Sequence, residues 1–568
     1  MMKRMKKVSA LALAAVAALS CVGCAPEGDG IVIDKARTQL YISYFNSGYG
    51  SAWLTEATKR FEPMYAEYSF EPGKKGVQIV PVPEALSDMS TIMATGPNSS
   101  VFFCDIYDQG AYRSQGVLAD ITDAVTTSLG ESYGKDINGT PLPAYEGETK
   151  SIAEKYSAEE FISHATKVNG EYTFGAVPYI DTCSGSWTYD ADVFEKYFLY
   201  FNSNNVIATN KAMGNLGLGP DGVANTADDG LPRTLDEMET LITKMISYGI
   251  VPFNSWGGSF LYSNDAALSL LISSLGEDVF KSVLTGSGTM PNVIADPTTV
   301  ENGYTTESKT FNESTAHRTV LQTEASYRIA QFYQKVATGF DGKAYRWVDA
   351  TSGIYSQYQA QRDFYFGAEL ARDYGILVDG TWWMIEAEKE IKDYEAENSE
   401  SKTRIDRNVL FMPFPKATEA DWERLRGENM QYQAYRTGIA VRSGLSEMQQ
   451  LLAETFVRFY CTDYSLYEYT KIVSQPRGLQ YTFDDTQYES LTPYARSLYS
   501  IKTSDEEHGY GTYKAVANVT ESAWGVANAG TFKMGSKIFM STKGTGILNS
   551  FYNDADLTAD AYFKGYFA

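Results

Sequence analysis

One stretch of the sequence decides the fold: QLYISYFNSGYGSAWLTEATKRFEPMYAEYSFEPGKKGVQIVPV, from Gln39 to Val82. Its two ends, QLYISYF and GVQIVPV, are short runs rich in β-branched and aromatic residues, which are typical of strands. A strand, a helix and a second strand joined by short links predict a βαβ unit and therefore an α/β fold. The helix is indicated by apolar residues at helical spacing, namely Trp53, Ala57, Phe61, Met64, Tyr65 and Tyr68.

Further elements follow along the chain. The run SSVFFCDIYD, from Ser99 to Asp108, predicts another strand. TLDEMETLITKMISYG opens with Thr234-x-x-Glu237, which predicts a helix with a capping box. Ser446 can cap a later amphipathic helix. The charged stretch from Glu386 to Arg407 predicts a solvated helix and loop.

The N-terminus has the pattern of an export signal. Four basic residues precede a short apolar run from Val8 to Leu19, which is too short to span a bilayer comfortably. Small residues then lead to two cysteines, Cys21 and Cys24. The segment resembles a bacterial lipoprotein signal, which implies cleavage and lipidation at Cys24, with Cys21 as the alternative acceptor. Residues 1–23 are then the signal peptide and residues 24–37 a tether.

Composition narrows the class of protein. Removing residues 1–23 takes away four positive charges and no negative ones, so the net charge changes from −23 to −27. Such a surface argues against nucleic acid and against adsorption to anionic lipid. The cysteines after the signal, Cys104, Cys183 and Cys461, are too few for a disulfide framework. The 41 tyrosines could line a carbohydrate cleft, but composition alone favours tyrosines that pack at the surface of a large exported protein.

The loop GPDGVANTADDGLPRT, from Gly219 to Thr234, is rich in oxygen ligands. Closely spaced carboxylates and amides in a glycine-containing loop suit a structural Ca²⁺. The loop lacks the order of an EF-hand, so a solvated turn before the capped helix is the competing interpretation. The calcium ligands would be Asp221, Asn225, Asp228 and Asp229.

Six stretches, taken in order, resemble the extracellular solute-binding proteins of ABC importers, especially the large carbohydrate-binding group. The series covers roughly residues 38–480, while residues 198–229, 285–315 and those after about 482 are expanded relative to that pattern. The stretches are STIMATGPNSSVFFCDIYDQGAYRSQGVLADITD, YTFGAVPYIDTCSGSWTYDADVFEKY, DGLPRTLDEMETLITKMISYGIVPF, GILVDGTWW, VLFMPFP and AYRTGIAVRSGLSEMQQLLAETFVRFY.

The resemblance implies a two-lobed periplasmic-binding-protein-like fold of type II. Each lobe would be a mixed sheet flanked by helices, and the second lobe would be enlarged. Lobe 1 would hold residues 38–180 plus 436–475, and lobe 2 residues 181–435 plus 476–568. The resemblance further implies a lipid-anchored monomer on the outer face of the bacterial cell membrane. It would carry an oligosaccharide to the transmembrane subunits of an ABC permease and would need no cofactor.

Candidate ligand-binding residues follow predicted strands or lie at predicted crossings, because open α/β sheets bind ligands beyond the carboxyl ends of their strands. Acids and amides can bond sugar hydroxyls, and tryptophan can stack on a sugar ring. The candidates are Asn46, Ser47, Trp53, Asp105, Asp108, Trp187, Trp256, Trp382, Trp383, Arg436 and Arg477.

Several of these candidates have a competing structural role. Trp53 heads the apolar stripe of a helix, so a place in the core is about as well supported. Of Trp382 and Trp383, one should face the cleft and the other the core, because neighbours on a strand point to opposite faces. Arg436 and Arg477 could instead form a salt link between lobes.

No sequence motif indicates catalysis. The three histidines, His164, His317 and His508, lack metal-binding spacing, and the nucleophile and phosphate-loop motifs are absent. We therefore expect a binding protein and not an enzyme. The alternatives are a secreted glycoside hydrolase, which needs only two suitably placed carboxylates, and a polysaccharide-binding lipoprotein without a role in transport.

Overall fold

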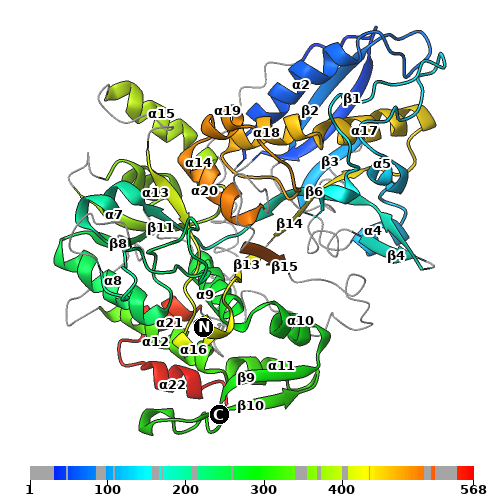
Figure 1. Cartoon of the computed structure of the whole chain (residues 1–568). Helices are drawn as coiled ribbons and strands as arrows, with labels where there is room; N and C mark the ends of the chain where they lie inside the picture. Colours follow the sequence, from blue (N-terminus) through cyan, green and yellow to red (C-terminus); the bar gives the residue numbers. More distant parts are fainter. Residues whose placement is uncertain are drawn as a thin grey trace, which may run out of the picture.

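The computed structural model describes residues 31–46, 49–84, 98–105, 109–156, 165–168, 170–207, 215–256, 260–339, 355–367, 372–398, 407–433, 435–503, 513–517 and 546–567. The main sheets are mixed and flanked by helices, so the predicted α/β class is confirmed. We call the five-stranded sheet with its helices lobe 1 and the four-stranded sheet with its helices lobe 2. Figure 1 shows lobe 1 at the upper right and lobe 2 at the lower left. The predicted boundaries of the lobes stay a prediction.

Lobe 1 is built on the predicted βαβ unit. β1 (Thr38–Phe45) lies parallel to β2 (Val77–Glu84), and α2 (Ala52–Met64) connects the two strands. On its other side β1 pairs in parallel with β3 (Val101–Asp105). The sheet has the order β2-β1-β3-β14-β6. It is completed by β14 (Tyr435–Val441) and β6 (Ala176–Thr182), and β14 runs antiparallel to both of its neighbours, β3 and β6.

Helix α2 buries most of its predicted stripe. Trp53, Ala57 and Phe61 lie in the core of lobe 1, as does Tyr65 just after the helix. The prediction is wrong at Met64, which is 40 % exposed. Pro63 lacks the backbone N–H that would continue the helical bonding, and the helix ends one residue later with Met64 turned to solvent.

Lobe 2 has a sheet of order β12-β7-β11-β8. β7 (Ser186–Asp190) runs antiparallel to β12 (Val409–Met412) and to β11 (Tyr374–Asp379). β11 runs parallel to β8 (Val251–Ser255). The carboxyl ends of β11 and β8 therefore meet at the same edge of the sheet.

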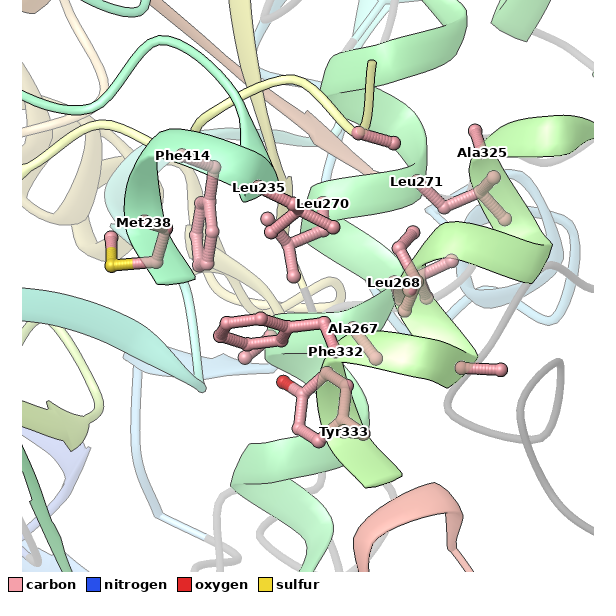
Figure 2. Packing of buried hydrophobic residues seen from close by; sticks show 14 of the residues in the cluster. Leu235, Met238, Ala267, Leu268, Leu270, Leu271, Ala325, Phe332, Tyr333 and Phe414 are labelled. Carbon is pink, nitrogen blue, oxygen red and sulfur yellow. The ribbon is translucent and has the colours of Figure 1, made fainter. Parts of the chain in front are cut away.

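The main core of lobe 2 lies between this sheet and three long helices, α8 (Leu235–Ser247), α9 (Phe260–Leu275) and α12 (Glu324–Thr338). Figure 2 shows Phe332 and Tyr333 of α12 beside the leucines of α9. The Phe332 ring lies 6.3 Å from the rings of both Trp187 and Phe253, so it joins the helix layer to the sheet.

Two helices near the C-terminus complete the same core. α21 (Ile547–Asn553) and α22 (Ala559–Lys564) pack on α12, and α21 also packs on α9. The Tyr327 ring of α12 lies 5.0 Å from the Phe563 ring. The Gln334 side chain of α12 accepts a hydrogen bond from the backbone N–H of Ala559 at 2.8 Å.

The predicted helix caps are confirmed in part. Thr234 accepts a hydrogen bond from the N–H of Glu237 at 3.4 Å. The Glu237 carboxylate does not return to Thr234 but accepts from the N–H of Arg233 at 2.8 Å, so the predicted capping box is only half formed. The predicted cap at Ser446 is present, and together with Gln449 it forms a complete capping box at the start of α17 (Glu447–Tyr460).

The described residues also include the first part of the charged stretch and the three later cysteines. The charged stretch forms α15 (Glu388–Glu397), in which Ile391 is buried. Cys104, Cys183 and Cys461 are buried. Within the described part of the chain, no helix combines the length and the apolar character needed to cross a bilayer. Residues 1–30, with Cys21 and Cys24, lie outside that part.

Three segments carry the chain between the lobes. The first crossing segment, residues 183–185, joins β6 to β7. The second leads from β13 (Asn429–Gln433) to β14. The third, residues 474–478, follows α18 (Asp463–Val473) and leads towards α20 (Pro493–Lys502), which packs against β12. β15 (Tyr513–Ala517) pairs in parallel with β13, and Figure 1 shows the pair between the lobes.

The remaining elements are shorter or peripheral. They are α4 (Gln109–Ser114), α5 (Thr122–Thr126), η2 (Ala153–Lys155), β4 (Ala165–Val168), β5 (Glu171–Phe174), α7 (Ala191–Tyr197), α10 (Glu277–Thr285), β9 (Gly288–Ile294), η4 (Val300–Asn302), β10 (Thr306–Phe311), α11 (Ala316–Leu321), α13 (Gln357–Tyr365), α14 (Trp383–Glu386), α16 (Glu419–Arg424) and α19 (Asp485–Glu489).

The packing predicts the effect of a cavity in lobe 2. Phe332→Ala should lower the free energy of unfolding by about 3–5 kcal/mol, because it removes a fully buried ring that touches both layers. Urea denaturation followed by circular dichroism measures this loss. Val206→Ala, at a position that is 59 % exposed, is the control and should change stability by less than about 0.5 kcal/mol. Equal stability of the two variants would contradict the assigned core.

Candidate functional site

Aromatic side chains meet where the two lobes face each other. Trp382 follows β11 in lobe 2, and its ring lies 6.2 Å from the ring of Tyr49, which follows β1 in lobe 1. The same ring lies 6.2 Å from Tyr262 in the first turn of α9. Both contacts are edge-on, with interplanar angles of 79°. We call these three residues the interlobe aromatic group.

The backbone explains why this group lies at the junction. β8 and β11 are parallel neighbours, with Ser255 opposite Val378, so the segments that follow them leave the sheet at one edge. Trp382 follows β11, and the half-buried Trp256 follows β8 directly. The half-buried Asn46 follows β1 at the facing edge of lobe 1. This is the edge at which open α/β sheets hold ligands.

Three of the predicted tryptophans are core residues, at most 2 % exposed. The Trp53 indole donates to the carbonyl of Gly50 at 3.0 Å and packs among aromatic rings of lobe 1. Trp187 belongs to the main core of lobe 2. Their prediction as ligand-binding residues is therefore wrong, because Trp53 lies on the inward face of α2 and Trp187 on the covered face of β7.

Trp382 and Trp383 separate, although not for the predicted reason. β11 ends at Asp379, and Trp383 is the first residue of helix α14. The Trp383 indole is fully buried and donates to the Thr188 hydroxyl at 3.1 Å. Trp382, at 9 % exposed, stays at the lobe junction. The start of a helix, and not strand alternation, sends the two side chains apart.

Arg477 is neither a ligand-binding residue nor part of a salt link. Its guanidinium is fully buried and donates to the backbone carbonyls of Tyr179 at 2.8 Å, Tyr460 at 2.9 Å and Pro178 at 3.2 Å. It also lies 4.6 Å from the centre of the Tyr460 ring. No carboxylate among the described residues pairs with it. Arg477 thus fixes the third crossing segment to lobe 1.

The side chains of four further candidate ligand-binding residues lie outside the part of the chain that the structure describes. Ser47 and Asp108 lie outside the described residues, and so do the side chains of Asp105 and Arg436. Tyr49 and Tyr262 were not predicted. Tyr49 could have been found, since it follows the first strand within the quoted stretch FNSGYGSAW. Tyr262 gave no comparable signal, because only the packing of α9 brings it to the junction.

A pair of carboxyl groups, the buried Asp379 and the half-buried Glu386, lies behind the turn that carries Trp382. The Gln361 side-chain amide donates to Asp379 at 2.9 Å and to Glu386 at 2.8 Å. Asp379 also accepts from the N–H of Gly380 at 2.7 Å. Burial, and then the neighbouring Glu386 carboxylate, raise the pKa of Asp379 to about 8. At neutral pH the pair therefore holds a proton.

Two carboxylates of the acidic loop from Gly219 to Thr234 are buried. The prediction of a solvated turn is therefore wrong at these two residues. Asp221 and Asp228 are 1 % and 2 % exposed. The Asp228 carboxylate accepts from the N–H of Asp221 at 3.0 Å, and Asp229 accepts from the N–H of Asn225 at 2.8 Å. No group of three or more His, Cys, Asp or Glu side chains among the described residues is placed to hold a metal. Calcium at Asp221, Asn225, Asp228 and Asp229 stays a prediction.

The carboxyl pair predicts a pH dependence of stability. Because the pKa of Asp379 is raised to about 8 in the folded state, folded Asp379 holds its proton up to about pH 8. In the unfolded chain the same carboxyl group loses its proton near pH 4. The stabilisation by this proton is complete below about pH 4 and is lost as the pH rises to about 8. Asp379→Asn should therefore flatten the fall of the melting temperature across this window, as measured by differential scanning calorimetry.

A matched control separates this effect from the general charge of the protein. Asp485→Asn removes an exposed carboxylate at the start of α19 and should leave the pH slope unchanged. An unchanged slope in Asp379→Asn would show that the pair does not retain the proton.

Comparison with known proteins supports the fold. No protein-family model matches the chain, and no curated protein matches its sequence. Among solved structures, a chitin oligosaccharide binding protein is 15 % identical, with a TM-score of 0.50 over 93 % of this chain and 97 % of that chain. Apo RafE from Streptococcus pneumoniae is 14 % identical, with a TM-score of 0.48 over 94 % and 98 % of the two chains. The chain therefore shares the α/β fold of the chitin oligosaccharide binding protein along nearly its whole length.

Proposed function

We propose that this protein is an extracellular solute-binding protein that captures an oligosaccharide between its lobes and delivers it to an ABC permease. The observation that carries the proposal is the interlobe aromatic group, with Trp382 held between Tyr49 of one lobe and Tyr262 of the other. Aromatic faces cover the C–H groups of sugar rings, and their polar edges bond hydroxyls. A ligand at this place would touch both lobes at once.

The surroundings of the group support a carbohydrate. Trp256 offers a second half-buried indole at the adjacent strand end, and Asn46 offers an amide from the facing lobe. Specific small-molecule sites combine apolar and aromatic walls with a few such polar groups. The strongly acidic chain also disfavours polyanionic ligands.

The fold supports the same proposal. The solved chitin oligosaccharide binding protein has this fold over nearly the full length of both chains. Two lobes joined by three crossing segments are suited to hinge closure around a ligand. A monomer anchored by its N-terminal lipid would let such a cleft meet the permease at the membrane surface.

The carboxyl pair Asp379 and Glu386 does not favour a glycoside hydrolase. Asp379 is 2 % exposed and bonds Gln361 and the backbone of Gly380, so it faces protein and not a ligand. A hydrolase needs two carboxylates on either side of the scissile bond. We therefore expect any bound oligosaccharide to be released unchanged, and chromatography that finds shortened products would contradict the proposal.

The first experiment is a thermal-shift screen over diverse oligosaccharides. A true ligand at about one hundred times its Kd should stabilise the folded protein by about 2.7 kcal/mol. With that ligand, Trp382→Ala should weaken binding at least about tenfold by isothermal titration calorimetry, which is about 1.4 kcal/mol. Tyr464→Ala, which removes an aromatic side chain that is 53 % exposed on α18, is the control and should bind normally. Equal affinity in both variants would exclude the interlobe aromatic group as the site.

The proposed anchor is tested separately. Cys24→Ala should leave the full-length precursor unlipidated and abolish incorporation of labelled palmitate in a bacterial host. Cys21→Ala should still be lipidated and should fractionate with the membrane. The opposite result would move the acceptor to Cys21, and normal labelling of both variants would contradict lipidation at either cysteine alone.

A further inference from the structure

Thr381 lies between the buried end of β11 and Trp382, and it is 4 % exposed. Its backbone N–H donates to the carbonyl of Cys183 at 3.1 Å. Its hydroxyl oxygen in turn accepts from the N–H of Cys183, at 3.4 Å. Thr381 is therefore bonded in both directions to the first crossing segment.

The same hydroxyl reaches the third crossing segment. The Gln475 side-chain amide donates to it at 2.8 Å. The carbonyl of Thr381 accepts from the Tyr494 hydroxyl of α20 at 3.1 Å. One buried residue thus joins two of the three crossing segments and the helix that follows the third.

The neighbouring residues tie Trp382 to this junction. A Cβ on Gly380 would lie 2.4 Å from the Trp382 indole, so the ring rests directly on the backbone of the turn. A Cβ on Gly185 would lie 2.2 Å from the carbonyl of Tyr262, so the first crossing segment also lies against the first turn of α9. Both lobe 2 members of the interlobe aromatic group are therefore in contact with the crossing segments or one residue away from them.

We propose that Thr381 is a positioning residue that couples the interlobe aromatic group to the hinge. This coupling rests on the proposed function, in which Trp382 contacts the ligand. Hinge closure concentrates backbone rotation in a few connecting residues. Rotation at Cys183, or movement of lobe 2 relative to Gln475, strains the hydrogen bonds of Thr381 and moves Trp382 with them. A ligand that fixes Trp382 favours one arrangement of these bonds, and so it shifts the balance between lobe orientations.

The test compares Thr381→Val, which removes the hydroxyl at nearly constant shape, with Thr381→Ser, which keeps it. In the ligand-free protein, amide hydrogen exchange at Cys183 should be at least about tenfold faster in the valine variant, because its N–H loses a buried acceptor. It should be near the parent rate in the serine variant. Thr319→Val is the control, since the Thr319 hydroxyl bonds only within its own helix, at Thr315.

The second measurement uses the oligosaccharide found by the thermal-shift screen. In the parent and in Thr381→Ser, ligand should slow exchange at Cys183 and compact the protein in small-angle scattering. In Thr381→Val, ligand should still bind but should no longer slow exchange at Cys183. A residue that only stabilised the fold would leave this ligand effect intact.

The outcomes separate the two proposals. Parent-like exchange at Cys183 in Thr381→Val, with or without ligand, would overturn the role of Thr381 and leave the proposed function standing. Fast exchange in Thr381→Val without any carbohydrate ligand in the screen would support the hinge contact and count against the proposed function. Faster exchange at Cys183 in Thr319→Val would also overturn the assignment, because it would reduce the effect to general destabilisation.

Discussion

The arrangement of the lobes depends on a buried arginine that has no carboxylate partner among the described residues. A guanidinium removed from water is costly unless its donors and its charge are satisfied. Arg477 meets this requirement with three backbone carbonyls and the surrounding tyrosine rings, all from lobe 1. Backbone carbonyls cannot move away without unfolding β6 or the end of α17. The third crossing segment is therefore anchored firmly to lobe 1 at Arg477.

This anchoring decides where the molecule can bend. With Arg477 fixed, rotation of lobe 2 has to take place on the lobe 2 side of that residue and in the short first crossing segment. Thr381 contacts both places, because it bonds Cys183 in the first crossing segment and Tyr494 on the lobe 2 side of Arg477. The rigid and the movable parts of the junction thus lie only a few residues apart, and Trp382 and Tyr262, the lobe 2 members of the aromatic group, lie on the movable side.

The sequence predictions that the structure confirms were based on local patterns. The βαβ unit, the cap at Ser446 and the helical charged stretch each follow from residues close together in the chain. The predictions that failed concern the direction in which a side chain points, into the core or towards solvent. Trp187 lies on β7, which a distant helix, α12, covers, and Trp383 begins α14, which turns its side chain away from that of Trp382. Burial of Asp221 and Asp228 also depends on distant contacts, such as the Trp422 indole bonded to the carbonyl of Gly219.

The C-terminal helices of lobe 2 have a consequence for biogenesis. The last buried side chain of the lobe 1 core is Tyr499 in α20, so this core is complete before α21 is synthesised. α12 ends at Thr338, and α21, which covers it, begins more than two hundred residues later at Ile547. Throughout that interval of synthesis an apolar helix face of lobe 2 stays uncovered. A chaperone that recognises such faces would find its target in lobe 2 and not in lobe 1.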